Sequence, residues 1–389
     1  MRQSENHARR RRLLAMLSLV ALWVALRNPE LAAAQEVVRD SISCPRCVIS
    51  IAMNARMGDR DGPESFPHLP HSVVTDSRGR FWLLFSDEPP AVFRQDGAFL
   101  QSVGGSGSGP GEYRSPRAAL AVGDSVAVFD VSGRVTVVGP DLSYVRDTQL
   151  VGPSSLTGVF ALRWPDSVVV AGLSRDAAGV GWPLHLTDLG GRPASVVRSF
   201  GSGDGRYIQG SRRFLRHVIA SSRTGGTWST SQYDYQVTRW RRNATTDVSL
   251  RVQSAWAPTQ STGLMGGPEV APGPLIRAIH EDRRGLLWIV GWVAADDWRD
   301  VWKEVLRRNG RTALQQGEMA ATMVPLPHQL YRTRIEVVDV SAGAIIARHD
   351  FETGDVLEVL DDGRLVIGYE TDEGILYIEI ATATIEGTG

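Results

Sequence analysis

GPESFPHLPHSVVTDSRGRFWLLF, residues 62–85, and GPGEYRSPRAALAVGDSVAVFD, residues 109–130, are two copies of one pattern. Each copy has a Gly-Pro loop, an apolar run, a tight polar turn and a second apolar run. The second half of the pattern recurs further along the chain, around Val168, Trp228, Trp288 and Val366. Self-similarity over such lengths is typical of repeat architectures. The sequence therefore predicts a fold built from six copies of one β unit.

Most copies are followed by a second pair of alternating runs around a polar turn. Examples are AVFRQDGAFLQSV from Ala91 and IEVVDVSAGAIIARHDF from Ile335. Alternation with a period of two, interrupted by turn residues, is typical of β-hairpins. Two hairpins per copy make a four-stranded blade, so we predict an all-β fold, a six-bladed β-propeller. A sandwich and a solenoid are the alternatives, but a sandwich gives no reason for the long repeat and a solenoid gives none for an incomplete last copy.

The last copy lacks a strand. It shows three apolar runs, beginning at Val356, Arg364 and Ile375, before the chain ends. A closed ring of blades leaves no unpaired edge at its seam, so the missing strand must come from elsewhere. The segment VISIAMNARM, residues 48–57, alternates well and is predicted to close the last blade.

One segment interrupts the β pattern in the fifth copy. Asp296 and Asp297 precede WRDVWKEVLRR, whose apolar residues recur at helical spacing, and two arginines follow at its end. Acidic residues at the start and basic residues at the end favour a helix. We predict a helical insertion at about residues 296–310, with its apolar stripe packed on the propeller. A surface for a partner or a lid is the alternative.

The first 34 residues are typical of a secretory signal peptide. A basic cluster at residues 9–12 precedes an apolar run over residues 13–26 and a small-residue cleavage site, Ala-Ala-Ala before Gln35. A retained anchor helix is the alternative. Removal of this leader takes away six Arg and two Glu, so the net charge changes from −1 to −5. We therefore expect residues 35–389 to form one periplasmic or secreted domain that does not bind the membrane.

Cys44 and Cys47 are the two cysteines of the chain. In an exported protein such a pair is expected to be oxidised, so we favour a local disulfide. Val48 stands where a c-type haem site needs His, and a structural zinc site needs a second pair of ligands. A redox or metal role is the alternative to a structural one.

The composition excludes several classes of function. The chain has 42 Lys plus Arg against 43 Asp plus Glu, so it has no excess of positive charge for nucleic-acid binding. Lys303 is its one lysine, which leaves lysine-based catalysis and phosphate loops almost without a candidate. No Ser or Cys stands beside a His in a recognisable catalytic motif.

A family resemblance is carried by the stretch GSGPGEY, residues 107–113, and the run GDSVAVFD that follows it. The chain resembles the exported bacterial six-bladed β-propellers of the NHL-like and TolB-like class over about residues 44–385. The Cys-x-x-Cys pair before residues 58–63 is similar to a subgroup of these proteins. The resemblance implies the fold, but members include binding scaffolds, lactonases and lyases, so it does not imply one function.

Candidate site residues follow from position in the repeat. The first strand of each blade lines the channel of a propeller, and the offset between Trp82 and Trp228 maps His71 onto His217. The same offsets bring Arg277 and Asp355 to this level, and Arg117 is the counterpart in the second copy. These five residues are predicted to converge on the channel mouth, where they could bind an anion or, less favourably, a metal. Solvated polar residues at strand starts are the alternative.

Two functions remain open at this point. The first, which we favour, is a non-enzymatic scaffold that binds an unknown small molecule or protein at the channel face, needs no cofactor and is a monomer. The second is a metal-dependent, lactonase-like hydrolase or a lyase with calcium or zinc at the channel mouth. The sequence offers that metal few ligands besides His71 and His217, with His280 at a different depth and Asp355 and Glu358 near the channel.

Overall fold

The computed structural model describes residues 35–58, 64–151, 161–164, 167–175, 181–190, 194–201, 217–254, 256, 267, 269–309, 327–351, 354–371 and 373–387. The predicted signal peptide lies outside these residues. Within them, none of the helices has the length and apolar character needed to cross a membrane. The described chain is all-β apart from helix α2 (Trp298–Asn309) and the single turn α4 (Pro327–Leu330).

The strands form consecutive four-stranded antiparallel units, which we number along the chain. Unit 1 contains β3 (Ser72–Thr75), β4 (Phe81–Leu84), β5 (Ala91–Phe93) and β6 (Phe99–Ser102). Unit 2 contains β9 (Pro116–Val122), β10 (Ser125–Asp130), β11 (Arg134–Val138) and β12 (Tyr144–Val151). Unit 3 contains β13 (Ala161–Trp164), β14 (Ser167–Arg175), β15 (Gly181–Asp188) and β16 (Ala194–Phe200). Between units 1 and 2, β7 (Gly105–Ser106) and β8 (Glu112–Tyr113) form a short parallel pair.

The second half of the chain repeats this arrangement. Unit 4 contains β17 (His217–Ser221), β18 (Thr227–Ser231), β19 (Gln236–Trp240) and β20 (Thr246–Gln253). Unit 5 contains β21 (Leu275–Glu281), β22 (Leu286–Ala294), β23 (Tyr331–Asp339) and β24 (Ala344–Asp350). Unit 6 contains β25 (Asp355–Val359), β26 (Leu365–Glu370), β27 (Leu376–Glu386) and a strand from the N-terminal region, β2 (Val48–Met57).

The units are arranged in a closed ring. The first strand of each unit contacts the first strand of the next, and β25 of unit 6 contacts β3 of unit 1. Successive units also enclose clusters of buried apolar side chains. Each interface between units contains one cluster. From interface 1–2 round the ring to interface 6–1, the clusters contain in turn Trp82, Phe129, Phe200, Trp228, Val337 and Leu83. A ring of sheets that pack face to face around first strands is a β-propeller.

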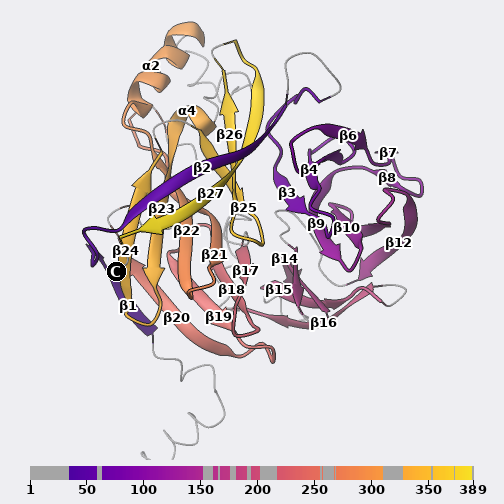
Figure 1. Cartoon of the computed structure of the whole chain (residues 1–389), viewed down its shortest axis with the longest axis horizontal. Coiled ribbons are helices and arrows are strands. Elements are labelled where there is room, and N and C mark those ends of the chain that lie inside the picture. The colour runs from indigo at the N-terminus through magenta and orange to yellow at the C-terminus, as the bar shows by residue number, and fades with distance from the viewer. Residues whose placement is uncertain are drawn as a thin grey trace, which may run out of the picture.

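The predicted closing strand is confirmed by its pairing. β2 forms an antiparallel ladder with β27, from Val48 opposite Glu386 to Met57 opposite Ile378. Figure 1 shows the indigo β2 lying along the yellow β27, so the two ends of the chain complete one sheet. The register of β2 shifts between Met53 and Ala55, which reverses the faces of the strand, so Ile49 enters the cluster between units 5 and 6 while Met57 enters the cluster between units 6 and 1.

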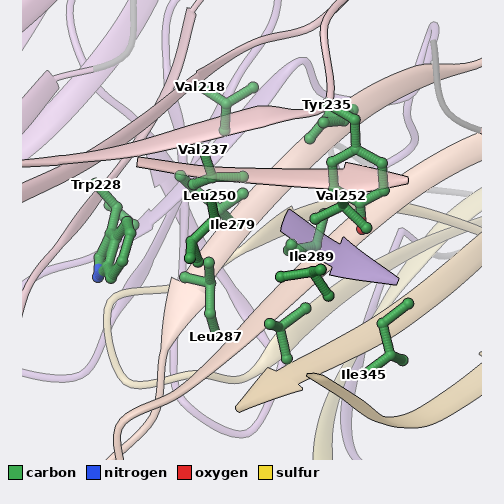
Figure 2. Close-up of a cluster of buried hydrophobic side chains, with 14 of the residues drawn as sticks. Val218, Trp228, Tyr235, Val237, Leu250, Val252, Ile279, Leu287, Ile289 and Ile345 are labelled. Atoms are coloured by element: carbon green, nitrogen blue, oxygen red, sulfur yellow. The ribbon is translucent and has the colours of Figure 1, made fainter. Parts of the chain in front are cut away.

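A second N-terminal strand was not predicted from the sequence. β1 (Gln35–Ile42) pairs in parallel with β20 of unit 4 and with β24 of unit 5, and so joins the outer strands of these two units. Its Val38 side chain is fully buried in the cluster between units 4 and 5. Figure 2 shows other members of this cluster, among them Trp228, Val252 and Ile289. The Cys44–Cys47 disulfide lies in the turn that joins β1 to β2.

Two of the repeated tryptophans, Trp82 and Trp288, have equivalent hydrogen bonds, which supports their alignment in the sequence. In unit 1 the Trp82 indole N–H donates to Asp76 at 3.0 Å, and in unit 5 the Trp288 indole donates to Asp282 at 3.2 Å. Each aspartate also accepts two backbone N–H groups of the following turn. In unit 4 Ser222 replaces this aspartate, and the Trp228 indole donates instead to Glu281 of unit 5 at 2.8 Å.

Replacing the unit 1 aspartate is expected to destabilise the fold. Burial favours a higher pKa for Asp76, but hydrogen bonds from Trp82, Arg80 and Arg78 outweigh burial and lower the pKa. Asp76→Ala leaves these donors without an acceptor, so the free energy of unfolding should fall by roughly 2–4 kcal/mol in urea denaturation. Asp96→Ala, in an exposed turn, is the matched control and should change little. Equal losses in the two variants would contradict this role for Asp76.

Helix α2 follows β22 at the position where the sequence predicted a helical insertion. Its Trp298 and Trp302 are buried in a satellite cluster together with Leu275, Trp292 and Tyr331 of unit 5. The apolar stripe of the helix therefore packs on unit 5, beside the start of the first strand β21.

Candidate functional site

The five predicted site residues all lie at or beside the starts of first strands. His71 immediately precedes β3, Arg117 is the second residue of β9, and His217 begins β17. Arg277 is the third residue of β21, and Asp355 begins β25. We call the end of the channel where these strands start the channel mouth. Four of the five residues form two pairs of neighbouring side chains there, which we call couples.

The first couple is His71 with Arg117, from units 1 and 2. Burial, and then the positive charge of Arg117, lower the pKa of His71 to about 4. The ring lies close to the backbone of Pro116 and Arg117, but among the described residues neither ring nitrogen has a hydrogen-bond partner of normal geometry. The Arg117 guanidinium donates to Ser86 Oγ at 3.2 Å. A neutral imidazole therefore lies beside a cation that a neighbouring side chain holds in place.

The second couple is Asp355 with Arg277, from units 6 and 5. Burial raises the pKa of Asp355 to about 7, against the attraction of Arg277. The Arg277 guanidinium stacks over the Trp292 ring at 4.3 Å from its centroid, and Nη2 donates to the Leu357 carbonyl at 3.5 Å. Because Trp292 belongs to the cluster that contains helix α2, the helical segment supports one wall of the channel mouth.

Both arginines occupy β-bulges, which the sequence did not reveal. In β9 the residues opposite Phe129 and Asp130 are Ala118 and Pro116, so Arg117 is the unpaired extra residue. In β21 the residues opposite Val290 and Gly291 are Ala278 and Ile276, so Arg277 is the extra residue. A bulge re-aims a side chain and is common beside functional sites. The two bulges lie near the starts of their strands, so each arginine is the extra residue of its first strand.

The Glu358 side chain lies near residues of both couples. Its Oε2 accepts the Val73 backbone N–H at 2.6 Å, next to His71, and Arg277 lies within its electrostatic range. Burial raises the pKa of Glu358 to about 7, against the hydrogen bonds from Val73 and Ser72. The sequence placed Glu358 only near the channel. Its position depends on a bulge at Leu357, which shifts the register between Val356 and Glu358.

His217 is the first residue of β17, in unit 4. Its side chain is buried, and burial alone lowers its pKa to about 4. A cavity of about 60 Å³ is lined by Ser72–Thr75, Ala118–Ala121, Ile219 and Glu358–Asp361, and none of the five predicted site residues belongs to this lining. This volume is sufficient for water or a small polar group. Within the described part of the chain, no group of three or more His, Cys, Asp and Glu side chains is arranged to hold a metal ion.

The buried groups at the channel mouth predict two opposite pH dependences. The lowered pKa of His71 means that its contribution to stability is complete above pH 6.5 and is lost as the pH falls towards 4. The raised pKa of Asp355 means that its contribution is complete below about pH 4 and is lost as the pH rises through 7.

The measurement is the free energy of unfolding between pH 4 and 8 for the wild type and two variants. Relative to the wild type, Asp355→Asn should gain roughly 1 kcal/mol per pH unit as the pH rises from 4 to 7. His71→Gln should instead gain stability relative to the wild type as the pH falls from 6.5 to 4. Parallel curves for all three proteins would show that neither group is buried as described.

Comparison with known proteins concerns the fold alone. No protein-family model matches the chain, and no curated protein matches its sequence. Among solved structures, a protein from Bacteroides fragilis named as an exported protein has 12% identity and a TM-score of 0.55, covering 90% of this chain and 100% of its own. A member of the DUF4221 family from Bacteroides vulgatus has 9% identity and a TM-score of 0.54, covering 86% of this chain and 98% of its own.

Proposed function

We propose that this protein is an exported six-bladed β-propeller that binds a ligand at its channel mouth without catalysing a reaction. The observation that carries the proposal is the pair of β-bulges that present Arg117 and Arg277 at the starts of their first strands. A scaffold that serves only to close a ring has no need for two buried or half-buried cations at this level, because burying charge opposes folding. The ligand therefore carries an anionic group, which the guanidinium groups recognise.

The blade count rests on the units themselves. The chain of contacts from β3 through β9, β13, β17, β21 and β25 back to β3 supports six blades. Helix α2 between β22 and β23 then forms an insertion in the fifth blade. With its early Cys-x-x-Cys pair, this architecture supports membership of the NHL-like and TolB-like class.

Export to the periplasm or the medium is supported by three features. The leader at residues 1–34 has the basic, apolar and small-residue regions of a signal peptide. The Cys44–Cys47 disulfide is typical of proteins in oxidising compartments. The similar Bacteroides fragilis structure is named as an exported protein. The proposed mature domain begins at Gln35 and acts as a monomer without a cofactor.

A thermal-shift screen of small molecules tests the proposal. Compounds that raise the Tm of the mature protein should fail to do so in the double variant Arg117→Gln, Arg277→Gln. The same compounds should still raise the Tm of Arg241→Gln, which changes an exposed arginine in the turn between β19 and β20. Hits that stabilise the double variant as well as the wild type would contradict a site at the channel mouth. Turnover of lactone or ester substrates by the wild type would contradict a purely binding role.

A further inference from the structure

Exposed arginines gather at the end of the channel opposite the mouth. The first strands start at the mouth, so the turn that follows each of them lies at the far end. β19 runs in the same direction as β17, so the β19–β20 turn also lies at the far end. Three of these turns, at residues 221–227, 240–246 and 281–286, together contain five arginines.

Hydrogen bonds between neighbouring turns connect the first of these arginines. Arg198 of β16 donates from Nη1 to the Asn243 carbonyl of unit 4 at 2.7 Å. Arg242, the residue before Asn243, donates from Nε to the Gly225 carbonyl at 3.1 Å. The β19–β20 turn of unit 4 therefore lies between unit 3 and the β17–β18 turn.

A close approach continues the row into unit 5. Arg223, in the same turn as Gly225, places Nη1 3.8 Å from the position of a Cβ atom on Gly285. Gly285 belongs to the β21–β22 turn, which also carries Arg283. We call the row that crosses units 3, 4 and 5 the arginine stripe, and it consists of Arg198, Arg242, Arg223 and Arg283.

The carboxylates beside the arginine stripe already bind other donors. Glu281 accepts the Trp228 indole N–H at 2.8 Å, Asp247 pairs with two further arginines, and Asp282 pairs with one. Within the described part of the chain, none of the four arginines of the stripe forms an ion pair, and all four are exposed. The stripe therefore presents four guanidinium groups that are available to an external anion.

Positive charge accumulates here against the net charge of the protein. The stripe and the three arginines bound to these carboxylates carry seven positive charges, and the three carboxylates reduce them to +4. Residues 35–389 as a whole carry −5. Such an uneven distribution produces a local positive potential, which attracts anions.

The arginine stripe is a surface and does not line the described cavity. A single ion pair on an exposed surface contributes little to binding. A ligand with one carboxylate therefore gains little affinity, whereas a chain with many carboxylates pairs with several arginines at once. The stripe accordingly fits a linear polyanion better than a small anion.

The composition of the stripe favours a polysaccharide over a protein or a membrane. Protein interfaces have an apolar core, and membrane-binding surfaces insert apolar side chains. Of the exposed large apolar side chains among the described residues, none lies in the three turns, and only Val197 adjoins a stripe residue in the sequence. Sugar rings also hold their carboxylates in a fixed arrangement, so an acidic polysaccharide loses less entropy on binding than an acidic peptide. We propose that the arginine stripe binds an acidic polysaccharide through its carboxylates, at a second site distinct from the channel mouth.

Binding of a long oligogalacturonate, with one carboxylate on each sugar, tests this proposal. Titration calorimetry of the mature protein at low salt should detect the oligomer but neither the galacturonate monomer nor neutral dextran. Raising the salt concentration from about 0.05 to 0.3 M should weaken the oligomer's affinity roughly tenfold, because salt screens exposed charges.

Two double variants separate the stripe from the overall charge. Arg223→Gln with Arg283→Gln removes two unpaired cations of the stripe, so the affinity should fall roughly tenfold. Arg78→Gln with Arg307→Gln removes two exposed arginines of unit 1 and helix α2, and should leave the affinity nearly unchanged. Circular dichroism and the Tm of each variant check that its fold is intact.

The outcomes distinguish this inference from the proposed function. Failure of the oligomer to bind at low salt would overturn the inference, as would equal losses in the two double variants. Tighter binding of polyglutamate or of phosphatidylglycerol vesicles through the same arginines would show that the partner is not a polysaccharide. Oligomer binding that is lost in Arg117→Gln with Arg277→Gln, but kept in the stripe variant, would place the polymer at the channel mouth. That result would overturn the inference while supporting the proposed function.

Discussion

Removal of residues 35–57 is expected to abolish cooperative folding. This segment places Val38, Ile49 and Met57 in three successive interfaces between units, and each of these side chains is at most 4% exposed. Burial of one such side chain contributes roughly 1.5–3 kcal/mol. The loss of three, together with the β27 ladder, is comparable with the whole stability of a domain, about 5–15 kcal/mol. The truncated chain would also have an unpaired β27 edge that favours aggregation.

Urea denaturation followed by the fluorescence of the 11 tryptophans measures this loss. The truncated chain should show no sharp transition, and a peptide of residues 35–57 added in trans should restore one. Two point variants in β2 provide a matched pair: Ile49→Asp should destabilise strongly, while Met53→Asp, at a position that is 50% exposed, should change little. A truncated chain that unfolds cooperatively at the wild-type urea concentration would show that the N-terminal strands do not close the ring.

Arg348→Met is expected to cost about 3–5 kcal/mol of unfolding free energy, because it leaves a buried charge without its partner. The Glu336 side chain is fully buried and accepts hydrogen bonds from Tyr235 at 2.7 Å and from Arg348 at 2.7 Å. Arg348 also binds Asp40 of β1. Asp40 belongs to β1, Tyr235 to unit 4, and Glu336 and Arg348 to unit 5. The four residues lie where β1 joins the two units.

A double variant separates the unpaired charge from other effects. Arg348→Met with Glu336→Leu removes both charges and should recover most of the stability lost in Arg348→Met alone. Arg307→Met, which breaks an exposed pair with Glu304 on helix α2, is the control and should leave the unfolding transition nearly unchanged. If the double variant is less stable than Arg348→Met, the loss comes from packing rather than from the buried charge.

Most of the fold could be predicted from periodicity. The repeated tryptophans mark equivalent positions because each indole has a carboxylate partner, and the incomplete last copy indicated that Val48–Met57 closes the ring. β1 was not predicted, because it pairs in parallel with strands of units 4 and 5 that lie more than 200 residues away in the sequence. Such contacts leave no local pattern in the sequence QEVVRDSI.

The stretch that carries the family resemblance has a structural role. The Arg134 guanidinium donates to the carbonyl oxygens of Ser108 and Gly109, at 2.8 and 2.9 Å, and Glu112 accepts the Gly109 N–H. Gly107 and Gly111 have positive φ angles, 151° and 72°, which favour glycine at these two positions. The residues that carry the resemblance therefore stabilise a loop, and these contacts give no evidence of ligand binding.

The positions of the candidate residues at strand starts were predicted from the sequence, but their geometry was not. Counting from the repeated tryptophans placed His71, Arg117, Arg277 and Asp355 at strand starts, and the structure pairs them as neighbours. The two arginine bulges and the seam contact of Glu358 depend on cross-strand register, which the composition of one strand does not specify. His217 occupies an equivalent strand start, and burial lowers its pKa as it does that of His71.

A structure of the mature protein with the compound that most raises its Tm tests the binding site most directly. We expect the compound between the first strands at the channel mouth, with an anionic group within hydrogen-bond distance of Arg117 or Arg277. A compound bound on the outer strands or on helix α2, with the channel mouth unchanged, would contradict the proposed site.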